Sequence, residues 1–169
     1  MCIRDSLLMA TKVDTEYTPA LEKVDLITLI NEVISKVQTK YPNAVFEKQF
    51  PPNEVTITGD KNGLISLTTN LLENAVKYSP KEQEIKIELS KEKGNILLKV
   101  ADQGVGIPDT EKKKVFERFY RVGNEGTRTS KGTGLGLYIV DQVVKKHKGR
   151  ISLEDNRPRG TVFRISLPG

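Results

Sequence analysis

The pattern of apolar residues predicts one domain of the α+β class, which combines helices with a sheet. Apolar residues recur at helical spacing in two long stretches and again after residue 136, whereas several shorter stretches alternate as strands do. The chain has 169 residues, of which 37% are hydrophobic and 29% are charged. This is enough for one buried core and too apolar for a disordered chain. We expect the folded domain over 20–169, after a tail and linker over 1–19.

Each expected helix has a recognisable start and end. The first follows the N-cap residue Asp25 and runs to about Thr39, and the second covers 61–78 after the N-cap residue Asp60. The third follows a glycine cluster and ends at 145–149, where cations suit the negative end of the helix dipole. A linker is expected over 16–23, with strands at 44–50, 54–58, 84–90, 96–101, 150–154 and 161–167 and a turn at 51–53.

Composition excludes several classes of protein. The net charge is +5, but Lys and Arg are interleaved with acidic residues, so we expect no nucleic-acid partner. Cys2 is the only cysteine, which excludes a disulfide framework and favours a reducing compartment, the cytoplasm. No apolar run approaches the roughly 18 residues of a membrane span, so we expect no direct membrane contact from this chain.

The expected helix 61–78 carries polar side chains beside an apolar stripe. Asn70 and Asn74 lie one turn apart on the same face, and Lys77 follows a turn later. Because a carboxamide oxygen can bind a hard cation and an ammonium can bind a phosphate, this face is a candidate site. The alternative is a solvated polar face beside the core stripe, which consists of Leu64, Leu67, Leu71 and Ala75.

A second candidate begins where the apolar strand 96–101 ends. Asp102 follows this strand directly, and Gly104 and Gly106 come soon after it. We expect a carboxylate at the floor of a cleft, able to accept a hydrogen bond from an exocyclic amine such as that of adenine. Glycines let a backbone approach a ligand closely because they lack a Cβ atom. The alternative is an ordinary Asp-Gly loop with positive φ angles.

The segment 115–121 combines aromatic side chains with cations. Its two arginines, Arg118 and Arg121, are placed to reach anions, and the chain beyond Arg121 is expected to form a mobile lid. The alternative is a plain surface loop with an aromatic anchor. The aromatic residues expected to anchor the segment on the core are Phe116, Phe119 and Tyr120.

Alternating glycines at 132, 134 and 136 open the third helix. Exposed backbone N–H groups and the positive end of the helix dipole favour a phosphate at such a position. The spacing matches neither a P-loop nor a Rossmann fingerprint, so the glycines alone do not identify a family.

Taken in chain order, these segments resemble a known family. They resemble the ordered motifs of the ATP-binding catalytic domain of sensor histidine kinases. Asn70–Tyr78 matches the N box, Asp102–Gly106 the first glycine box and Phe116–Tyr120 the F box. Gly132–Leu137 matches the second glycine box, and Gly160-Thr161 the terminal Gly-Thr. That domain belongs to the ATPase superfamily shared with gyrase and mismatch-repair ATPases. The resemblance implies a two-layer α/β sandwich, with a mixed, mostly antiparallel sheet packed against three helices and ATP under a flexible lid.

The resemblance also implies a role for each motif residue. ATP and Mg²⁺ are the implied cofactors, with Asn74 as the metal ligand and Asn70 supporting the metal and phosphates. Asp102 is implied to bind the adenine amine, and Thr161 to bridge to adenine through water. The other residues implied to contact the nucleotide are Lys77, Tyr78, Gly104, Gly106, Ile107, Arg118, Arg121, Gly132, Thr133, Gly134, Leu135, Gly136 and Leu137.

The implied activity is transfer of the ATP γ-phosphate to a histidine. In gyrase-like relatives the position of Asn70 resembles a Glu that activates water. A neutral amide cannot act as a general base, which favours transfer over hydrolysis. Glu73 is one turn away and is a further candidate for proton transfer, so the implied catalytic residues are Asn70, Glu73 and Lys77.

One departure from the family bears on the expected partners. The single histidine, His147, lies in a lysine-rich helix end, where a structural surface role is expected. The acceptor histidine is therefore expected on a dimerisation domain outside this chain, with 1–19 as a remnant of its helix. A response regulator is the expected downstream partner, and the parent protein is expected in the cytoplasm or anchored to the inner membrane. The alternatives are a single-domain anti-sigma factor or serine kinase of the same superfamily, and a non-catalytic docking module.

Overall fold

The computed structural model describes residues 18–80, 84–122 and 134–169. Its helices are α2 (Leu26–Lys40), α3 (Lys61–Tyr78) and α4 (Gly136–Lys146), with a short 3-10 helix, η1 (Lys114–Phe116). Within this part of the chain, no helix is long and apolar enough to cross a membrane. Its strands are β1 (Leu21–Asp25), β2 (Val45–Gln49), β3 (Thr56–Asp60), β4 (Glu84–Glu92), β5 (Asn95–Ala101), β6 (Arg150–Asp155) and β7 (Thr161–Pro168).

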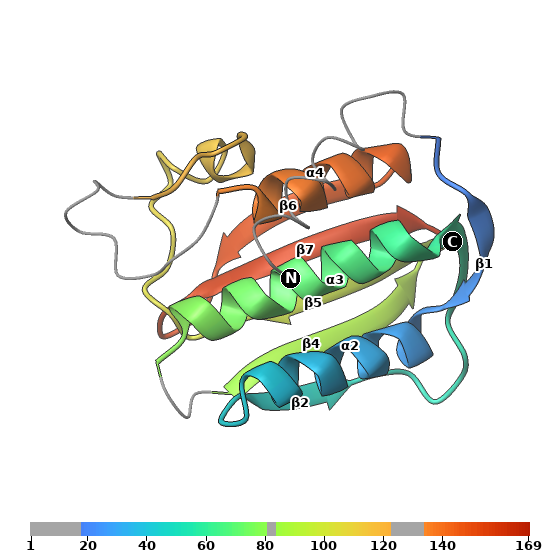
Figure 1. Ribbon diagram of the computed structural model, residues 1–169, viewed down its shortest axis with the longest axis horizontal. Coiled ribbons are helices and arrows are strands. Elements are labelled where there is room, and N and C mark those ends of the chain that lie inside the picture. Colours follow the sequence, from blue (N-terminus) through green and yellow to red (C-terminus); the bar gives the residue numbers. More distant parts are fainter. Residues whose placement is uncertain (1–17, 81–83, 123–133) are drawn as a thin grey trace.

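A five-stranded sheet and the helices form two layers (Figure 1). The strand order is β2-β4-β5-β7-β6, in which β2 runs parallel to β4 and the other neighbours are antiparallel. Helices α2, α3 and α4 lie side by side over one face of the sheet, with α3 in the middle. The predicted sandwich is therefore confirmed, whereas the predicted lid falls mainly on 123–133, outside the described residues.

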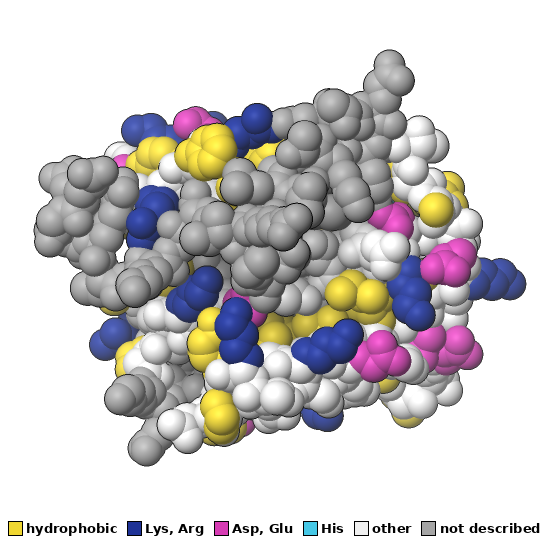
Figure 2. Space-filling model, viewed as in Figure 1, with side chains coloured by type: hydrophobic (Ala, Val, Ile, Leu, Met, Phe, Trp, Pro, Cys, Tyr) yellow, Lys and Arg dark blue, Asp and Glu magenta, His cyan; other side chains and the backbone are white. Residues whose placement is uncertain are grey.

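Alternation along the strands separates a buried face of the sheet from a charged one. In β4, Ile85, Ile87 and Leu89 are buried, whereas Lys86 and Glu88 point the other way and form an ion pair at 2.9 Å. The layer of helices covers the buried face. On the outer surface of that layer, Lys and Arg side chains are dispersed among acidic and neutral ones (Figure 2). The predicted stripe of α3 is buried against the sheet; it consists of Leu64, Leu67, Leu71 and Ala75.

A second, two-stranded sheet was not predicted. β1 pairs antiparallel with β3, with Val24 opposite Ile57. The predicted linker is therefore wrong at residues 21–23, and the strand predicted at 54–58 is observed at 56–60. Most of β1 is exposed, so its sequence lacks the apolar alternation that marks a half-buried strand. The turn at 51–53 connects two different sheets, because β2 and β3 do not pair.

Both predicted N-caps are confirmed. Asp25 Oδ1 accepts a hydrogen bond from the Ile27 N–H at 3.1 Å, and Asp60 Oδ2 accepts one from the Gly63 N–H at 3.0 Å. Each cap satisfies an N–H group that the first turn of a helix leaves without a partner. The helices therefore begin at fixed points relative to β1 and β3.

His147 is buried, so the prediction of a surface histidine is wrong. It closes α4 and is only 8% exposed. Its Nε2 accepts a hydrogen bond from the Asp60 N–H at 2.9 Å, so Nδ1 carries the ring proton and donates to the Val143 carbonyl at 2.7 Å. Gly59 gives the ring room, because a Cβ atom there would lie 3.0 Å from it. The end of α4 is thereby tied to the start of α3.

We expect His147→Leu to lower the free energy of unfolding by about 1–3 kcal/mol, the usual cost of leaving a buried N–H group without a partner. Urea denaturation of the purified chain measures this change. His147→Gln is the matched control, because its side-chain oxygen can accept the bond from Asp60, and it should lose less. Equal stability of the leucine variant and the wild type would contradict this role.

Candidate functional site

The C-terminal half of α3 changes from buried to exposed along the predicted polar face. Asn70 is buried, Asn74 is half-buried and Lys77 is exposed. Asn70 Nδ2 donates a hydrogen bond to the Ser66 carbonyl at 2.8 Å. Its Oδ1 faces the start of α4, where a Cβ atom on Gly136 would lie only 3.0 Å away. Asn70 and the last of the three predicted glycines are therefore brought together.

Asp102 lies directly beyond β5, and the residue is 3% exposed. Its Oδ1 accepts hydrogen bonds from the Gly104 N–H at 2.9 Å and the Thr161 N–H at 3.2 Å. The Asp102 N–H in turn donates to the Thr161 carbonyl at 2.9 Å. Burial raises the pKa of the Asp102 carboxyl above its ordinary value, although the two N–H groups partly oppose that rise. Within the described residues both bonds end on Oδ1, which leaves Oδ2 for a donor from a ligand.

The loop after β5 lies against the end of α3. A Cβ atom on Gly104 would lie 2.3 Å from the carbonyl oxygen of Tyr78, so only glycine fits there. Gly106 has a φ of +77°, and Ile107 packs against the core. This close approach places Tyr78, the last residue of α3, beside the Asp102 loop.

The aromatic segment is attached to the glycine segment. The Phe119 N–H donates to the Gly134 carbonyl at 3.0 Å, and a Cβ atom on Gly134 would lie 2.6 Å from the backbone of Phe119. Phe116 packs on the core as predicted, but Phe119 is 58% exposed, so its predicted role as a core anchor is wrong. Phe119 has a φ of +62°, in the left-handed region. The hydroxyl of Tyr120 instead binds the Glu111 carboxylate.

Arg118 contacts the first turn of α4. Its guanidinium donates to the Tyr138 hydroxyl at 3.2 Å and lies 4.9 Å from the centre of that ring. Leu135 is fully buried and Leu137 packs against the core. Arg121 is half-buried, and residues 132 and 133 lie outside the described part of the chain.

Glu73 lies on the side of α3 that faces α2. Its Oε1 lies 2.8 Å from Lys40 Nζ of α2, and it is only 7% exposed. This bond raises the pKa of Lys40. Since α2 and α4 flank α3 on opposite sides, Glu73 is not brought beside Gly136 as Asn70 is. Sequence reasoning missed Lys40, because no local pattern links residues so far apart in the chain.

Two more polar residues were missed by the sequence analysis. The side chains of Asn156 and Arg159, in the turn between β6 and β7, bind the backbone carbonyls of Asp102 and Gly104. The turn itself was expected, but nothing in its composition indicated what it touches.

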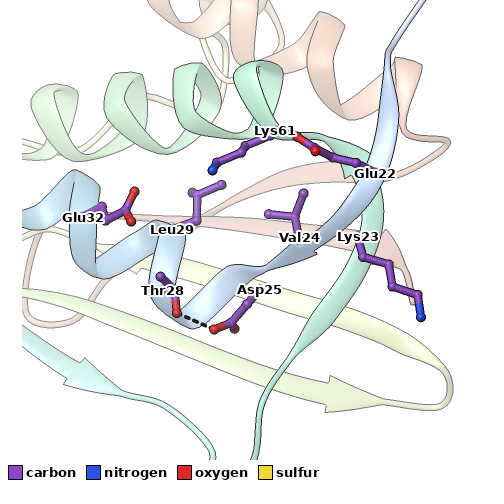
Figure 3. Close-up of a pocket in the computed structure, with 8 residues that line it drawn as sticks. All are labelled: Glu22, Lys23, Val24, Asp25, Thr28, Leu29, Glu32 and Lys61. Carbon is purple, nitrogen blue, oxygen red and sulfur yellow. Dashed lines mark hydrogen bonds between the residues drawn. The ribbon is translucent and has the colours of Figure 1, made fainter.

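A pocket of about 250 Å³ lies elsewhere in the molecule (Figure 3). Its walls come from β1, the start of α2 and the first residue of α3, Lys61. Because α3 rises about 1.5 Å per residue, Lys61 and Tyr78 lie at opposite ends of a long helix. This pocket is therefore separate from the site that the sequence motifs build.

The donor set of the motif site suits a nucleotide–metal complex better than a free metal ion. Within the described ranges, no group of three or more His, Cys, Asp or Glu side chains could hold a metal. Asn70 and Asn74 contribute carboxamide oxygens only. Mg²⁺ commonly binds to one or two protein oxygens together with water and substrate phosphates, so two carboxamides fit it when phosphates complete the shell.

Comparison with known proteins gives the same family throughout. Residues 59–169 match the model of the histidine kinase-, DNA gyrase B- and HSP90-like ATPases. The chain is 35% identical over 154 residues to the sensor-like histidine kinase SenX3 of Mycolicibacterium smegmatis, covering 90% of this chain and 40% of that protein. It is 31% identical over 168 residues to the sensor histidine kinase WalK of Bacillus subtilis, covering 97% of this chain and 28% of that protein.

Solved structures agree with the sequence relatives. A mycobacterial sensor histidine kinase, MprB, superposes with a TM-score of 0.78 at 35% identity, covering 89% of this chain and 98% of that one. The catalytic domain of the histidine kinase ThkA superposes with a TM-score of 0.76 at 27% identity, covering 88% and 95%. The resemblance inferred from the motifs is confirmed.

The raised pKa of Asp102 predicts a stability that falls with rising pH. The folded chain holds the Asp102 proton more tightly than the unfolded chain, so stability drops as pH rises from about 3.9, the ordinary pKa, through the raised one. We expect Asp102→Asn to raise the unfolding temperature at pH 7, with the gain shrinking toward pH 3. Calorimetry across this range measures it. Asp109→Asn should give no such gain, because Asp109 is exposed and its hydrogen bond with Lys112 lowers the pKa of its carboxyl. A lower unfolding temperature for Asp102→Asn at pH 7 would refute the argument.

Proposed function

The chain belongs to the histidine kinase-, DNA gyrase B- and HSP90-like ATPase family, as an ATP-binding catalytic domain of the histidine kinase type, and we propose that it binds Mg-ATP and transfers the γ-phosphate to a histidine on another domain. The observation that carries this proposal is the Asp102 carboxylate, which is buried with Oδ1 held by two N–H groups and Oδ2 left for a ligand. The chain spans less than half the length of the two sequence relatives described above.

In the proposed complex, Asp102 Oδ2 accepts a hydrogen bond from the adenine amine. Gly104, Gly106 and Ile107 form the adjoining wall in this proposal, and the close contact of Gly104 with Tyr78 holds that loop in place. Thr161, hydrogen-bonded to Asp102, bridges to adenine through water. A guanine base presents a carbonyl instead of an amine at this position, so the carboxylate selects adenine.

The phosphates are proposed to bind at the start of α4. The glycine segment Gly132–Leu137, which includes Thr133, Gly134 and Leu135, supplies backbone N–H groups and the positive end of the helix dipole. No side chain in the described residues caps this helix end. The flanking side chains proposed to face the phosphates are Lys77, Tyr78, Arg118 and Arg121.

Asn74, supported by Asn70, is the proposed Mg²⁺ ligand. When bound, the metal neutralises phosphate charge during transfer. Asn70 Nδ2 is engaged by the Ser66 carbonyl, which leaves its oxygen directed toward Gly136 and the start of α4. This orientation supports a role at the phosphates.

Positioning and charge neutralisation carry the proposed transfer. Lys77 is exposed at the end of α3 and stabilises negative charge on the transferred group. Asn70 is an amide and cannot activate water, which favours transfer over hydrolysis. The ion pair of Glu73 with Lys40 speaks against Glu73 as a general base, because its carboxylate already binds a cation on the other side of α3.

The acceptor histidine is proposed to lie on a dimerisation domain, and a response regulator to receive the phosphoryl group from it. His147, the one histidine of this chain, has both ring nitrogens in buried hydrogen bonds, so it is not available as the acceptor. The relatives carry the names of sensor kinases, which favours this proposal over a single-domain serine kinase or a docking module. A cytoplasmic position, with the parent protein anchored in a membrane, belongs to the same proposal.

Titration of the purified chain with a non-hydrolysable ATP analogue tests the binding site. We expect the affinity to rise when Mg²⁺ is added, and we expect Asn74→Ala to abolish that rise while leaving metal-free binding within about twofold. Asn62→Ala, at an exposed position in the first turn of the same helix, is the matched control. An unchanged Mg²⁺ effect in Asn74→Ala would remove the metal assignment.

Phosphotransfer separates the kinase from its alternatives. With ATP and Mg²⁺, the chain alone should form no phosphohistidine, and it should label a supplied dimerisation domain that carries the acceptor histidine. Lys77→Ala should slow labelling by about tenfold or more, because a positive charge that stabilises the transferred group is lost. His147→Gln should label the acceptor as the wild type does. Phosphohistidine on the isolated chain would disprove the assignment of the acceptor.

A further inference from the structure

The turn between β6 and β7, residues 156–160, contacts the loop that carries Asp102. Asn156 Nδ2 donates a hydrogen bond to the Asp102 carbonyl at 2.7 Å. Arg159 Nε donates one to the Gly104 carbonyl at 3.2 Å. The turn therefore holds the backbone at Asp102 itself and again two residues later.

The carbonyls of Asp102 and Gly104 lie beyond the end of the sheet. The last pair of the ladder between β5 and β7 joins Ala101 and Val162, so Asp102 is the first residue beyond it. A buried backbone carbonyl needs a hydrogen-bond partner, and Asn156 supplies it at Asp102. The side chain of Asn156 thus supplies the hydrogen bond that a neighbouring strand would supply inside the sheet.

The amide of Asn156 is itself oriented by the turn. Its Oδ1 accepts a hydrogen bond from the Arg157 N–H at 2.9 Å, which directs Nδ2 toward Asp102. The Asn156 N–H donates to the Gly160 carbonyl at 3.0 Å and closes the turn. Gly160 has a φ of +105°, and a Cβ atom there would lie 2.0 Å from the Asp102 carbonyl oxygen. The turn therefore packs directly against the loop.

We propose that Asn156 and Arg159 are positioning residues that set the selectivity of the site for the exocyclic amine of adenine. The inference rests on the proposed binding of adenine by Asp102, and neither Asn156 nor Arg159 is proposed to contact the base. Both act through the backbone: with Oδ1 bound to Gly104 and Thr161, the direction of Oδ2 follows from the backbone at Asp102 and Gly104.

Release of either carbonyl lets this backbone rotate and misaligns Oδ2 with the amine. Such a change weakens one hydrogen bond of the base, because hydrogen bonds weaken steeply when they bend. Stacking on the base and contacts with the phosphates are the same for every purine nucleotide and are retained. The loss of affinity is therefore specific to nucleotides that carry the amine.

The test compares ATP with purine riboside triphosphate, which has the same shape and lacks the amine. Calorimetric titration of the full chain gives the ratio of their dissociation constants. For the wild type we expect ATP to bind about ten- to a hundredfold more tightly, as one hydrogen bond to a charged group predicts. Asn156→Ala and Arg159→Ala should each reduce this ratio by about three- to tenfold, mainly through weaker ATP binding.

Arg157→Ala is the matched control for Arg159→Ala. It removes the same charge from the same turn, and the only described hydrogen bond of Arg157 uses its backbone N–H. Its ratio should equal that of the wild type. Arg159 is exposed, so its variant tests the inference even where Asn156→Ala unfolds the domain.

Two results would overturn the inference in distinguishable ways. Equal weakening of both nucleotides in Asn156→Ala and Arg159→Ala would mean that the turn only stabilises the fold. If the wild type and Asp102→Ala both bind the two nucleotides equally well, the adenine assignment of Asp102 fails, and the inference fails with it.

Discussion

The candidate site depends on one buried carboxylate, that of Asp102, at the end of a central strand. Removing this charge from water raises the pKa of the carboxyl, and two backbone N–H groups offset part of that cost. Close approach of three backbone segments provides those groups, and glycine is needed where they meet, at Gly104 and Gly160. The proposed base-binding site is thereby assembled without ligand, at some expense in stability.

Helix α4 is held against α3 at both of its ends. His147 joins the end of α4 to the start of α3, and Gly136 packs against Asn70 where α4 begins. On the other side of α3, the pair formed by Glu73 and Lys40 ties that helix to α2. Contacts outside the motifs therefore fix how the polar face of α3 meets the glycine segment.

Local patterns predicted much of the fold. Apolar periodicity and the caps at Asp25 and Asp60 gave the helices of the described part of the chain, because these signals lie within a few residues of each other. Features that depend on distant contacts were missed, namely the strand β1 and the burial of His147. Asp102 was chosen as a candidate from its place after a strand, whereas Asn156 and Arg159, which bind the backbone around it, come from the β6–β7 turn, far along the chain. The nucleotide itself was inferred from the order of the motifs, since no single motif specifies it.

A crystal structure of the chain with Mg²⁺ and a non-hydrolysable ATP analogue tests the central claim most directly. The account predicts the adenine amine within hydrogen-bond distance of Asp102 Oδ2, with Oδ1 still bound to Gly104 and Thr161, and the metal on Asn74. A base bound away from Asp102, or a carboxylate that turns away to admit it, would contradict a site already assembled in the free protein.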